Sequence, residues 1–209
     1  VTIDAYLTNA VRFVTSDKTK LENVTIKNVD FQFVTGAGQK GGACVVIDPA
    51  AQIENLVIED CKIAGDSNKN SYGIVGQNPN ATITVKNCIF NNLGYAIQTI
   101  AGGGYASLVV EGCTFENIKS WAIMPQYNDY LGDLTVNNCN FVNCVGGLVK
   151  AGKFVAGKTF TFTNNVITNS SEHPAKNWFT IDASAGTAVV NGNTKDGAAW
   201  TPGATEGLN

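Results

Sequence analysis

A nine-residue phrase recurs along the chain, and this period constrains the possible folds more than any other feature. Six full copies begin at Asn23, Asn55, Thr82, Ser107, Asp133 and Thr159, and a degraded seventh copy begins at Thr187. The start-to-start spacings are 32, 27, 25, 26, 26 and 28 residues. A period of this size is typical of a solenoid, in which each repeat buries its apolar side by stacking on its neighbours. We therefore expect a single stacked domain.

Apolar residues alternate within each copy of the phrase. Val24 and Ile26 in the first copy, like Ile83 and Val85 in the third, are separated by a threonine. Alternation with period two, rich in β-branched residues, predicts a half-buried strand. After a short corner that often contains Asn or Gly, a Cys and a Phe or Ile indicate a second strand. A looser phrase, such as Gly94-Tyr-Ala-Ile-Gln98, predicts a third strand in each repeat.

Three short strands per turn of the chain predict a parallel β-helix of about seven rungs, where a rung is one turn of the solenoid. A leucine-rich repeat is the alternative, because Ile53-x-x-Leu56-x-Ile58-x-x-Cys61-x-Ile63 fits its pattern. That fold needs a helical return in each repeat. The returns here include Gly102-Gly-Gly104 and Asn78-Pro-Asn80, which favour turns over helices. We therefore favour the β-helix.

The phrase also divides the chain. Residues 1–20 lack it, so we expect an N-terminal cap there, either a short helix or an irregular rung that covers the end of the core. Residues 21–193 form the predicted parallel β-helix. Residues 194–209, with Gly197, Pro202 and Gly203, form a C-terminal tail or cap.

Four of the six cysteines occupy one slot of the phrase: Cys61, Cys88, Cys113 and Cys139. In a solenoid they form a column with a step of about 4.8 Å. Parallel Cα–Cβ vectors at this spacing hold the sulfurs too far apart for a disulfide. We predict reduced, buried thiols that pack as small apolar groups. Cys44 and Cys144 lie outside this column, and the pattern indicates no redox compartment.

Charge and hydropathy restrict the partners. The net charge is −3, and Arg12 is the only arginine, so the basic stripe that a nucleic-acid interface needs is missing. There is also no run of 18 apolar residues that would predict a membrane span. The chain begins without Met or a signal peptide, and we expect it to be a piece of a longer protein with neighbouring domains.

Over residues 21–193, the I-x-V-x-x-C/N-x-F phrase and the following Gly-Ile strands resemble the pectate-lyase-like right-handed β-helix proteins of bacteria. The closest similarity is to small repeat domains of bacterial surface and secreted proteins. The resemblance implies a right-handed β-helix, an extracellular or cell-surface location, and contact with polysaccharide. Fold alone does not establish an activity.

Catalytic members of that superfamily use an Arg or Lys base, together with Ca²⁺ held by clustered acids or with basic side chains. The only arginine here lies in the predicted cap, and acidic pairs on successive rungs are missing. A partial Ca²⁺ loop begins at Asp66, but Ser71 and Gln77 replace its Gly and bidentate Glu. We expect no metal and no other cofactor. The known catalytic patterns do not transfer, so the sequence leaves enzyme activity undecided and favours a non-catalytic domain, with a polysaccharide lyase as the enzyme alternative.

Four aromatic residues, Tyr72, Tyr95, Trp121 and Trp178, are candidate ligand-binding residues, because each precedes the apolar centre of a third-strand phrase. If their shared position faces solvent, the rings form a line on which sugar units stack. If it faces inward, as alternation in a regular strand predicts, the rings form an internal stack. Both interpretations remain open.

Two further groups of residues are weaker candidates. Tyr127, Asp129 and Tyr130 lie in a long loop, and loops on rigid scaffolds often carry binding residues. Lys150, Lys153, His173 and Lys176 are the main concentration of basic groups, and a Lys or His is a possible base for β-elimination.

These observations lead to three functional hypotheses. The first is a non-catalytic extracellular β-helix domain of a larger bacterial surface or secreted protein that contacts polysaccharide. The second is a polysaccharide lyase that acts on a uronic-acid-containing glycan through Lys150, Lys176 or His173. The third is a structural spacer or adhesin stalk.

Overall fold

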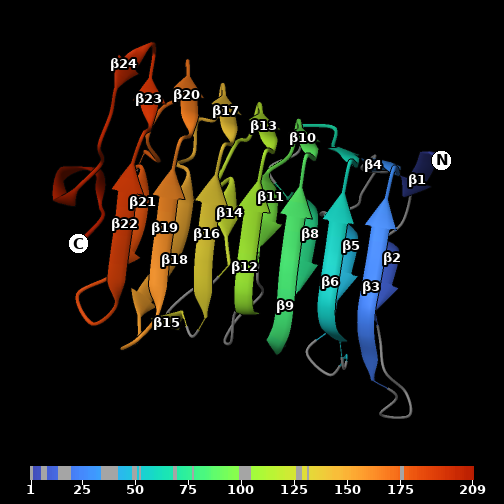
Figure 1. Ribbon diagram of the computed structural model, residues 1–209. Coiled ribbons are helices and arrows are strands. Elements are labelled where there is room, and N and C mark those ends of the chain that lie inside the picture. Colours follow the sequence, from blue (N-terminus) through green and yellow to red (C-terminus); the bar gives the residue numbers. More distant parts are fainter. Residues whose placement is uncertain are drawn as a thin grey trace.

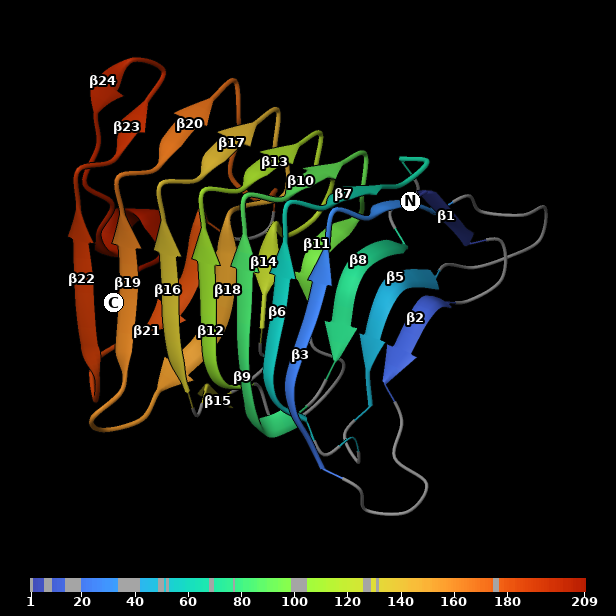
Figure 2. The same ribbon diagram turned by 45° about the vertical axis from the view of Figure 1, so that its right-hand side comes forward.

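The computed structural model describes most of the chain. The described residues are 2–5, 9–13, 20–33, 42–48, 51, 53–67, 70–76, 78–98, 105–125, 129–130, 132–174 and 177–209. They form three sheets, here named A, B and C, that run side by side along a solenoid (Figures 1 and 2). Every strand pair is parallel except the last one in sheet A.

Sheet A has nine strands: β1 (Thr2–Ala5), β4 (Asp30–Phe33), β7 (Lys62–Ala64), β10 (Ile89–Asn91), β13 (Thr114–Glu116), β17 (Asn140–Val142), β20 (Val166–Thr168), β23 (Thr194–Lys195) and β24 (Ala198–Ala199). Sheet B has eight: β2 (Asn9–Phe13), β5 (Gly42–Ile47), β8 (Ser71–Gly76), β11 (Tyr95–Gln98), β14 (Ile123–Met124), β15 (Asp129–Tyr130), β18 (Val149–Phe154) and β21 (Phe179–Asp182). Sheet C has seven: β3 (Leu21–Lys27), β6 (Ile53–Glu59), β9 (Asn78–Lys86), β12 (Tyr105–Glu111), β16 (Asp133–Asn137), β19 (Thr159–Thr163) and β22 (Thr187–Asn191).

The repeated phrase maps directly onto this architecture. Each of its seven copies supplies one strand of sheet C, and the Cys or Asn slot leads into a strand of sheet A. The looser phrase supplies the strands of sheet B. The prediction of a parallel β-helix is confirmed. The number of strands differs slightly between the sheets, so the expected seven rungs describe sheet C alone.

The leucine-rich-repeat alternative required a helical return in every repeat. Among the described residues, the one helical segment is the 3₁₀ turn η1 (Ala204–Glu206) near the C-terminus. The first segment likewise supplies strands: β1 pairs with β4, and β2 pairs with β5. Of the two forms considered for residues 1–20, the described part is an irregular rung.

Inward-facing side chains of the three sheets form one continuous core. Phe90, Phe115 and Phe141 are fully buried on successive strands of sheet A, and their ring centroids lie 5.1 and 4.9 Å apart. Ile97, Ile123 and Val149 form a corresponding buried column in sheet B. Since the strands repeat at about 4.8 Å, identical positions stack in register, which explains why the phrase conserves residue size at each slot.

Each strand of sheet C is followed directly by a residue with positive φ: Asn28, Asp60, Asn87, Gly112, Asn138, Asn164 and Gly192. Asn, Asp and Gly tolerate this left-handed conformation best. The N–H of each of the first six donates to a carbonyl of the following rung, at 2.9–3.2 Å. A Cβ added to Gly112 would lie 2.6 Å from Oδ1 of Asn87, so a larger residue there would displace the Asn87 side chain.

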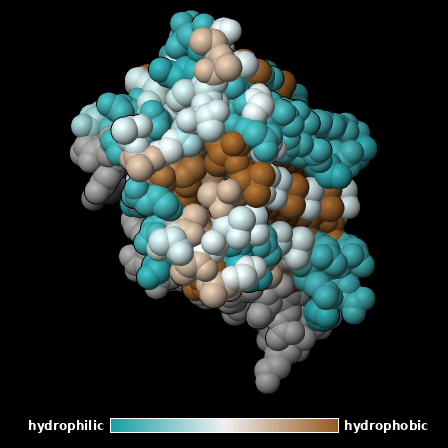
Figure 3. Space-filling view, turned by 60° about the vertical axis from the view of Figure 1, so that its left-hand side comes forward, coloured by the Kyte–Doolittle hydropathy of each residue, from teal (hydrophilic) through white to brown (hydrophobic). Residues whose placement is uncertain are grey.

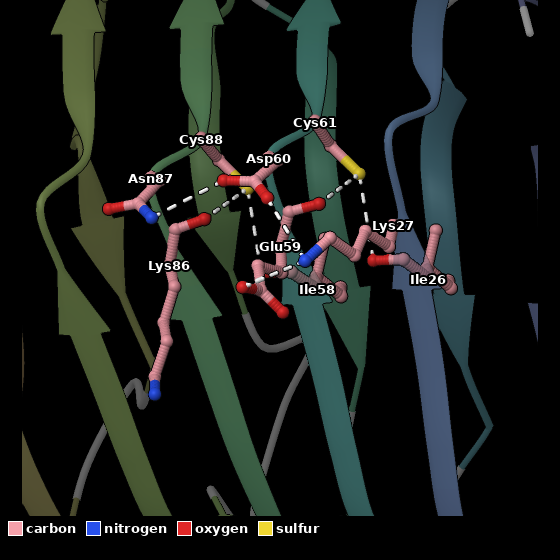
Figure 4. A network of polar contacts seen from close by, with 9 residues as sticks. All are labelled: Ile26, Lys27, Ile58, Glu59, Asp60, Cys61, Lys86, Asn87 and Cys88. Carbon is pink, nitrogen blue, oxygen red and sulfur yellow. Dashed lines mark hydrogen bonds and ion pairs between the residues drawn. The ribbon is translucent and has the colours of Figure 1, made fainter.

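The thiols of Cys61 and Cys88 fill the slot after this corner and donate to backbone carbonyls (Figure 4). Cys88 Sγ lies 3.1 Å from the carbonyl oxygen of Lys86 in its own rung and 3.5 Å from that of Ile58 in the preceding one. Cys113 and Cys139 repeat the arrangement. All six cysteines are free and buried, in agreement with the prediction that the thiols are reduced.

Asn165 and Asn193 continue this column where the phrase has no cysteine. The Asn165 side chain accepts the N–H of Cys139 at 2.9 Å and donates to the carbonyl of Val136 at 3.1 Å. Asn193 accepts the N–H of Asn165 at 2.9 Å and donates to the carbonyl of Phe162 at 3.0 Å. From the second copy to the seventh, the slot therefore holds a small side chain that bonds to backbone groups of the preceding rung, either a thiol or an amide.

The thiols are expected to be unreactive in the folded protein. Burial raises the pKa of Cys44 and of Cys144 to about 12, and hydrogen bonding to the next thiol together with burial raises the pKa of Cys88 further. Because the thiolate is the nucleophile, a disulfide reagent such as Ellman's should label none of the six quickly in the native state and all six in guanidinium. Rapid native labelling of Cys113 would contradict the buried column.

Asn165 provides a test of the slot itself. Asn165→Ala leaves the buried N–H of Cys139 without its partner and removes the side-chain bond to the carbonyl of Val136, so it should lower the free energy of unfolding by about 1–3 kcal/mol. Asn165→Cys, the residue that the neighbouring copies use, should cost about half as much or less. Guanidinium denaturation of the two variants checks this, and a Cys variant as unstable as the Ala variant would refute the proposed equivalence.

Candidate functional site

The register of sheet B determines which side chains lie on its outer face. Tyr72 pairs with Tyr95, and Ile97 pairs with Ile123, so Trp121 occupies the position of Tyr95 on the next strand. Continuing through the Ile123–Val149 and Val149–Phe179 pairs, the same column passes Gly147 and ends at Asn177. We call the side of sheet B that carries this column the outer face of sheet B.

Tyr72 and Tyr95 lie outside the core cluster and are half-buried. Their ring centroids are 5.3 Å apart, and the ring planes differ by 20°. Rings stacked along the solenoid cover each other's facing sides, so this pair does not present an open line of ring faces. This geometry is neither of the two alternatives considered from the sequence, an internal stack or an open line of faces.

Trp121 is only 3% exposed, although it does not belong to the core cluster. The ring of His173 stacks on it with centroids 5.3 Å apart and planes at 10°. On the neighbouring rung, a Cβ added to Gly147, where φ is +93°, would lie 2.6 Å from the Trp121 ring. Trp121 therefore packs between a histidine and a backbone, and these contacts restrict access to the faces of its ring.

The prediction that Trp178 shares this column is wrong. Phe179 is the residue that pairs with Val149, so Trp178 is one position out of register and belongs to the core cluster. It packs edge-on against Trp200 at 5.5 Å, with Lys195 Nζ 5.0 Å from its ring centroid. The sequence-based alignment matched the aromatic residues of neighbouring repeats. The structure instead pairs the central apolar residues of the strands, Val149 with Phe179.

A hollow of about 520 Å³ lies at the C-terminal end of sheet B. Its lining comes from β18, β21 and the last residues of the chain: Gly152, Lys153, Asn177, Phe179, Thr180, Ile181, Asp182, Gly207 and Asn209. Asn177 belongs to the aromatic column, and Thr180 pairs with Lys150. The hollow is thus continuous in register with the outer face of sheet B.

Opposite charges meet at the hollow. Lys153 and Asp182 are paired residues on adjacent strands, and Lys153 is exposed. Hydrogen bonds from Ser184 hold the pKa of Asp182 below its usual range, and the charge of Lys153 acts in the same direction. Asp182 is therefore a carboxylate at neutral pH. The lining combines one cation, one anion and two side-chain amides.

The structure brings some of the predicted basic residues together. Lys150 is half-buried beside Thr180, and His173 stacks on Trp121, so both lie on or beside the outer face of sheet B. Lys176 lies outside the described residues. Sequence reasoning noted Lys153 but missed Asn177, Asp182 and Asn209. Aligning Phe179 with Val149 would have placed Asn177 in the aromatic column. Asn209 reaches the site only because the C-terminal residues pack beside β21.

The remaining candidates are less well defined. Asp129 and Tyr130 form β15, which pairs with β18, and Tyr127 lies outside the described residues. Asn68 of the partial Ca²⁺ loop also lies outside them. Within the part of the chain that the structure describes, no group of three or more His, Cys, Asp or Glu side chains is placed to hold a metal ion.

No helix among the described residues is long and apolar enough to cross a membrane. No curated protein matches the chain, and no solved structure matches it. The family model for the right-handed β-helix region matches residues 9–196, which is most of the chain and spans all three sheets. The chain belongs to the right-handed β-helix family.

Proposed function

We propose that this chain is a non-catalytic, extracellular β-helix domain of a larger bacterial surface or secreted protein, and that it contacts polysaccharide along the outer face of sheet B. The observation that carries the proposal is the polar hollow over β18 and β21. The hollow and the half-buried Tyr72 and Tyr95 lie on the same side of the solenoid, the outer face of sheet B.

The lining of the hollow suits a neutral, hydroxyl-rich ligand. Asn177 and Asn209 each offer an amide donor and an acceptor, while Thr180 offers a hydroxyl group. Lys153 supplies donors, and Asp182 supplies acceptors. Concave sites with a few converging polar groups are typical of small-molecule recognition.

The dimensions favour a chain rather than a single sugar. From β11, which carries Tyr95, the outer face reaches β21 in three strand steps through β14 and β18, about 14 Å at strand spacing. Tyr72 and Tyr95 at one end and the hollow at the other would then contact different units of one extended glycan. A rigid solenoid holds these groups at fixed separations, which lowers the entropy cost of binding.

A structural spacer is the second candidate, and the burial of two of the four predicted rings favours it. Trp121 is covered by His173, and Trp178 is 9% exposed and packs against Trp200. If the outer face of sheet B binds nothing, the aromatic residues only stabilise the packing. The solenoid then serves only as a spacer of fixed length. The polysaccharide-lyase alternative remains a prediction from the sequence, because its Lys176 lies outside the described residues.

Affinity-gel electrophoresis tests the proposal with neutral, uronic-acid-containing and host-type polysaccharides in the gel. We expect at least one class to retard the protein. The double variant Lys153→Ala/Asn177→Ala should lose about tenfold or more in affinity, since it removes two polar groups from the hollow. Both residues are exposed, so the fold should be retained.

Lys62→Ala is the matched control, because this exposed lysine lies on sheet A and away from the hollow. Its retardation should equal that of the unmodified chain. Absence of retardation by every polysaccharide would favour the spacer. Retardation that is unchanged in the double variant would show that the hollow is not the binding site.

A further inference from the structure

The three sheets end differently at the C-terminal end of the solenoid, where every residue from 177 onward is described. In sheet A, β24 turns back and adds an antiparallel strand to β23. In sheet B, the last residues run beside β21: Leu208 bridges Ile181, and the N–H of Asn209 donates to the carbonyl of Ile181 at 3.0 Å. Two of the three edges are thus closed by one extended segment each.

Sheet C lacks such a segment, and β22 is its last strand. The N–H of Thr187 donates to the carbonyl of Lys158 at 2.9 Å, and the carbonyl of Asn191 accepts the N–H of Asn164 at 3.0 Å. Both bonds point back toward β19. Since backbone groups alternate in direction along a parallel strand, those of Ala188 and Val190 point away from the sheet. The edge therefore offers two N–H and two carbonyl groups to a further strand.

Side chains on this edge are also uncovered. Ala188 and Val190 pair with Phe160 and Phe162, which are fully buried, yet Ala188 is exposed and Val190 is half-buried. Val189, on the other face, is 39% exposed. Figure 3, which turns this end toward the viewer, shows hydrophobic residues gathered between hydrophilic margins. A free strand edge with apolar side chains and no charged residue is a template for strand addition.

We propose that the edge of β22 is a docking slot for one extended polypeptide segment of a partner, which adds to sheet C as a parallel or antiparallel strand. The other two edges show that this end closes by single added strands. Its occupant would place alternate apolar side chains over Ala188 and Val190 and keep polar side chains outward. The inference is independent of glycan binding, because sheets B and C are different faces of the solenoid.

A single strand fits the slot better than a second copy of the chain. The added segments on sheets A and B project one strand, about 4.8 Å, beyond the last rung. Figure 1 shows the C-terminal residues lying beyond β22. A second solenoid stacked end to end on this one would clash with those segments before its own strand could pair with β22. An isolated extended segment would not clash with them.

The probe is a fluorescein-labelled peptide with the sequence of residues 132–138, Gly-Asp-Leu-Thr-Val-Asn-Asn, which in the chain lies between two strands of sheet C. Fluorescence anisotropy should show saturable binding to the 209-residue chain. A peptide of the same composition with Leu and Val adjacent should bind at least tenfold more weakly. Adjacent side chains on a strand point to opposite faces, so this control peptide cannot direct both of its apolar residues toward the core.

Ala188→Pro removes the outward N–H without removing a bond to β19, and proline is tolerated at strand edges. It should weaken peptide binding at least tenfold, while Ala188→Ser, which keeps the N–H, should bind normally. If Ala188→Pro no longer melts cooperatively, Ala188→Glu replaces it, because an inward charge also blocks an edge.

Three results would overturn the proposal. They are no binding at millimolar peptide, equal binding to the blocked variant, and sedimentation that shows self-association lost in that variant. The last result would assign the edge to a second copy.

Discussion

The hydrogen bond between the corner of one rung and the carbonyl of the next is the interaction on which the rest of this molecule depends. A residue with positive φ follows each strand of sheet C, and from Asn28 to Asn164 its N–H points along the solenoid to the following rung. Asn, Asp or Gly is needed for the bend, and the bond fixes the height of one rung above another. In-register stacking of core phenylalanines and thiols follows from that fixed height.

Polar atoms inside such a stack must find partners, and the column that begins at Cys61 shows how the chain provides them. Thiols serve in four copies, and the amides of Asn165 and Asn193 make the same kinds of contact in later ones. A column of this type makes each rung depend on its neighbours. The backbone groups at the strand edges of the last rung also need partners, and the C-terminal residues provide them for sheets A and B but not for sheet C.

Much of the fold was predictable from the sequence, because the alternation of residues such as Leu56 and Ile58 and the repeated corner residues are local signals. The site was less predictable. Trp178 was assigned by residue type, although its place depends on the register of Phe179. Burial of Trp121 depends on His173, far along the chain. Asn209 reaches the hollow because the tail docks on β21, and no local pattern encodes that.

Amide hydrogen exchange followed by NMR is the most direct test of the corner bond as the organising interaction. The N–H groups of Asn87, Gly112, Asn138 and Asn164 should exchange slowly, with protection close to that of global unfolding. Gly192 occupies the same corner position but has no following rung in sheet C, so its N–H should exchange orders of magnitude faster. Fast exchange at Asn87 and Asn138, or protection at Gly192 equal to theirs, would contradict the account.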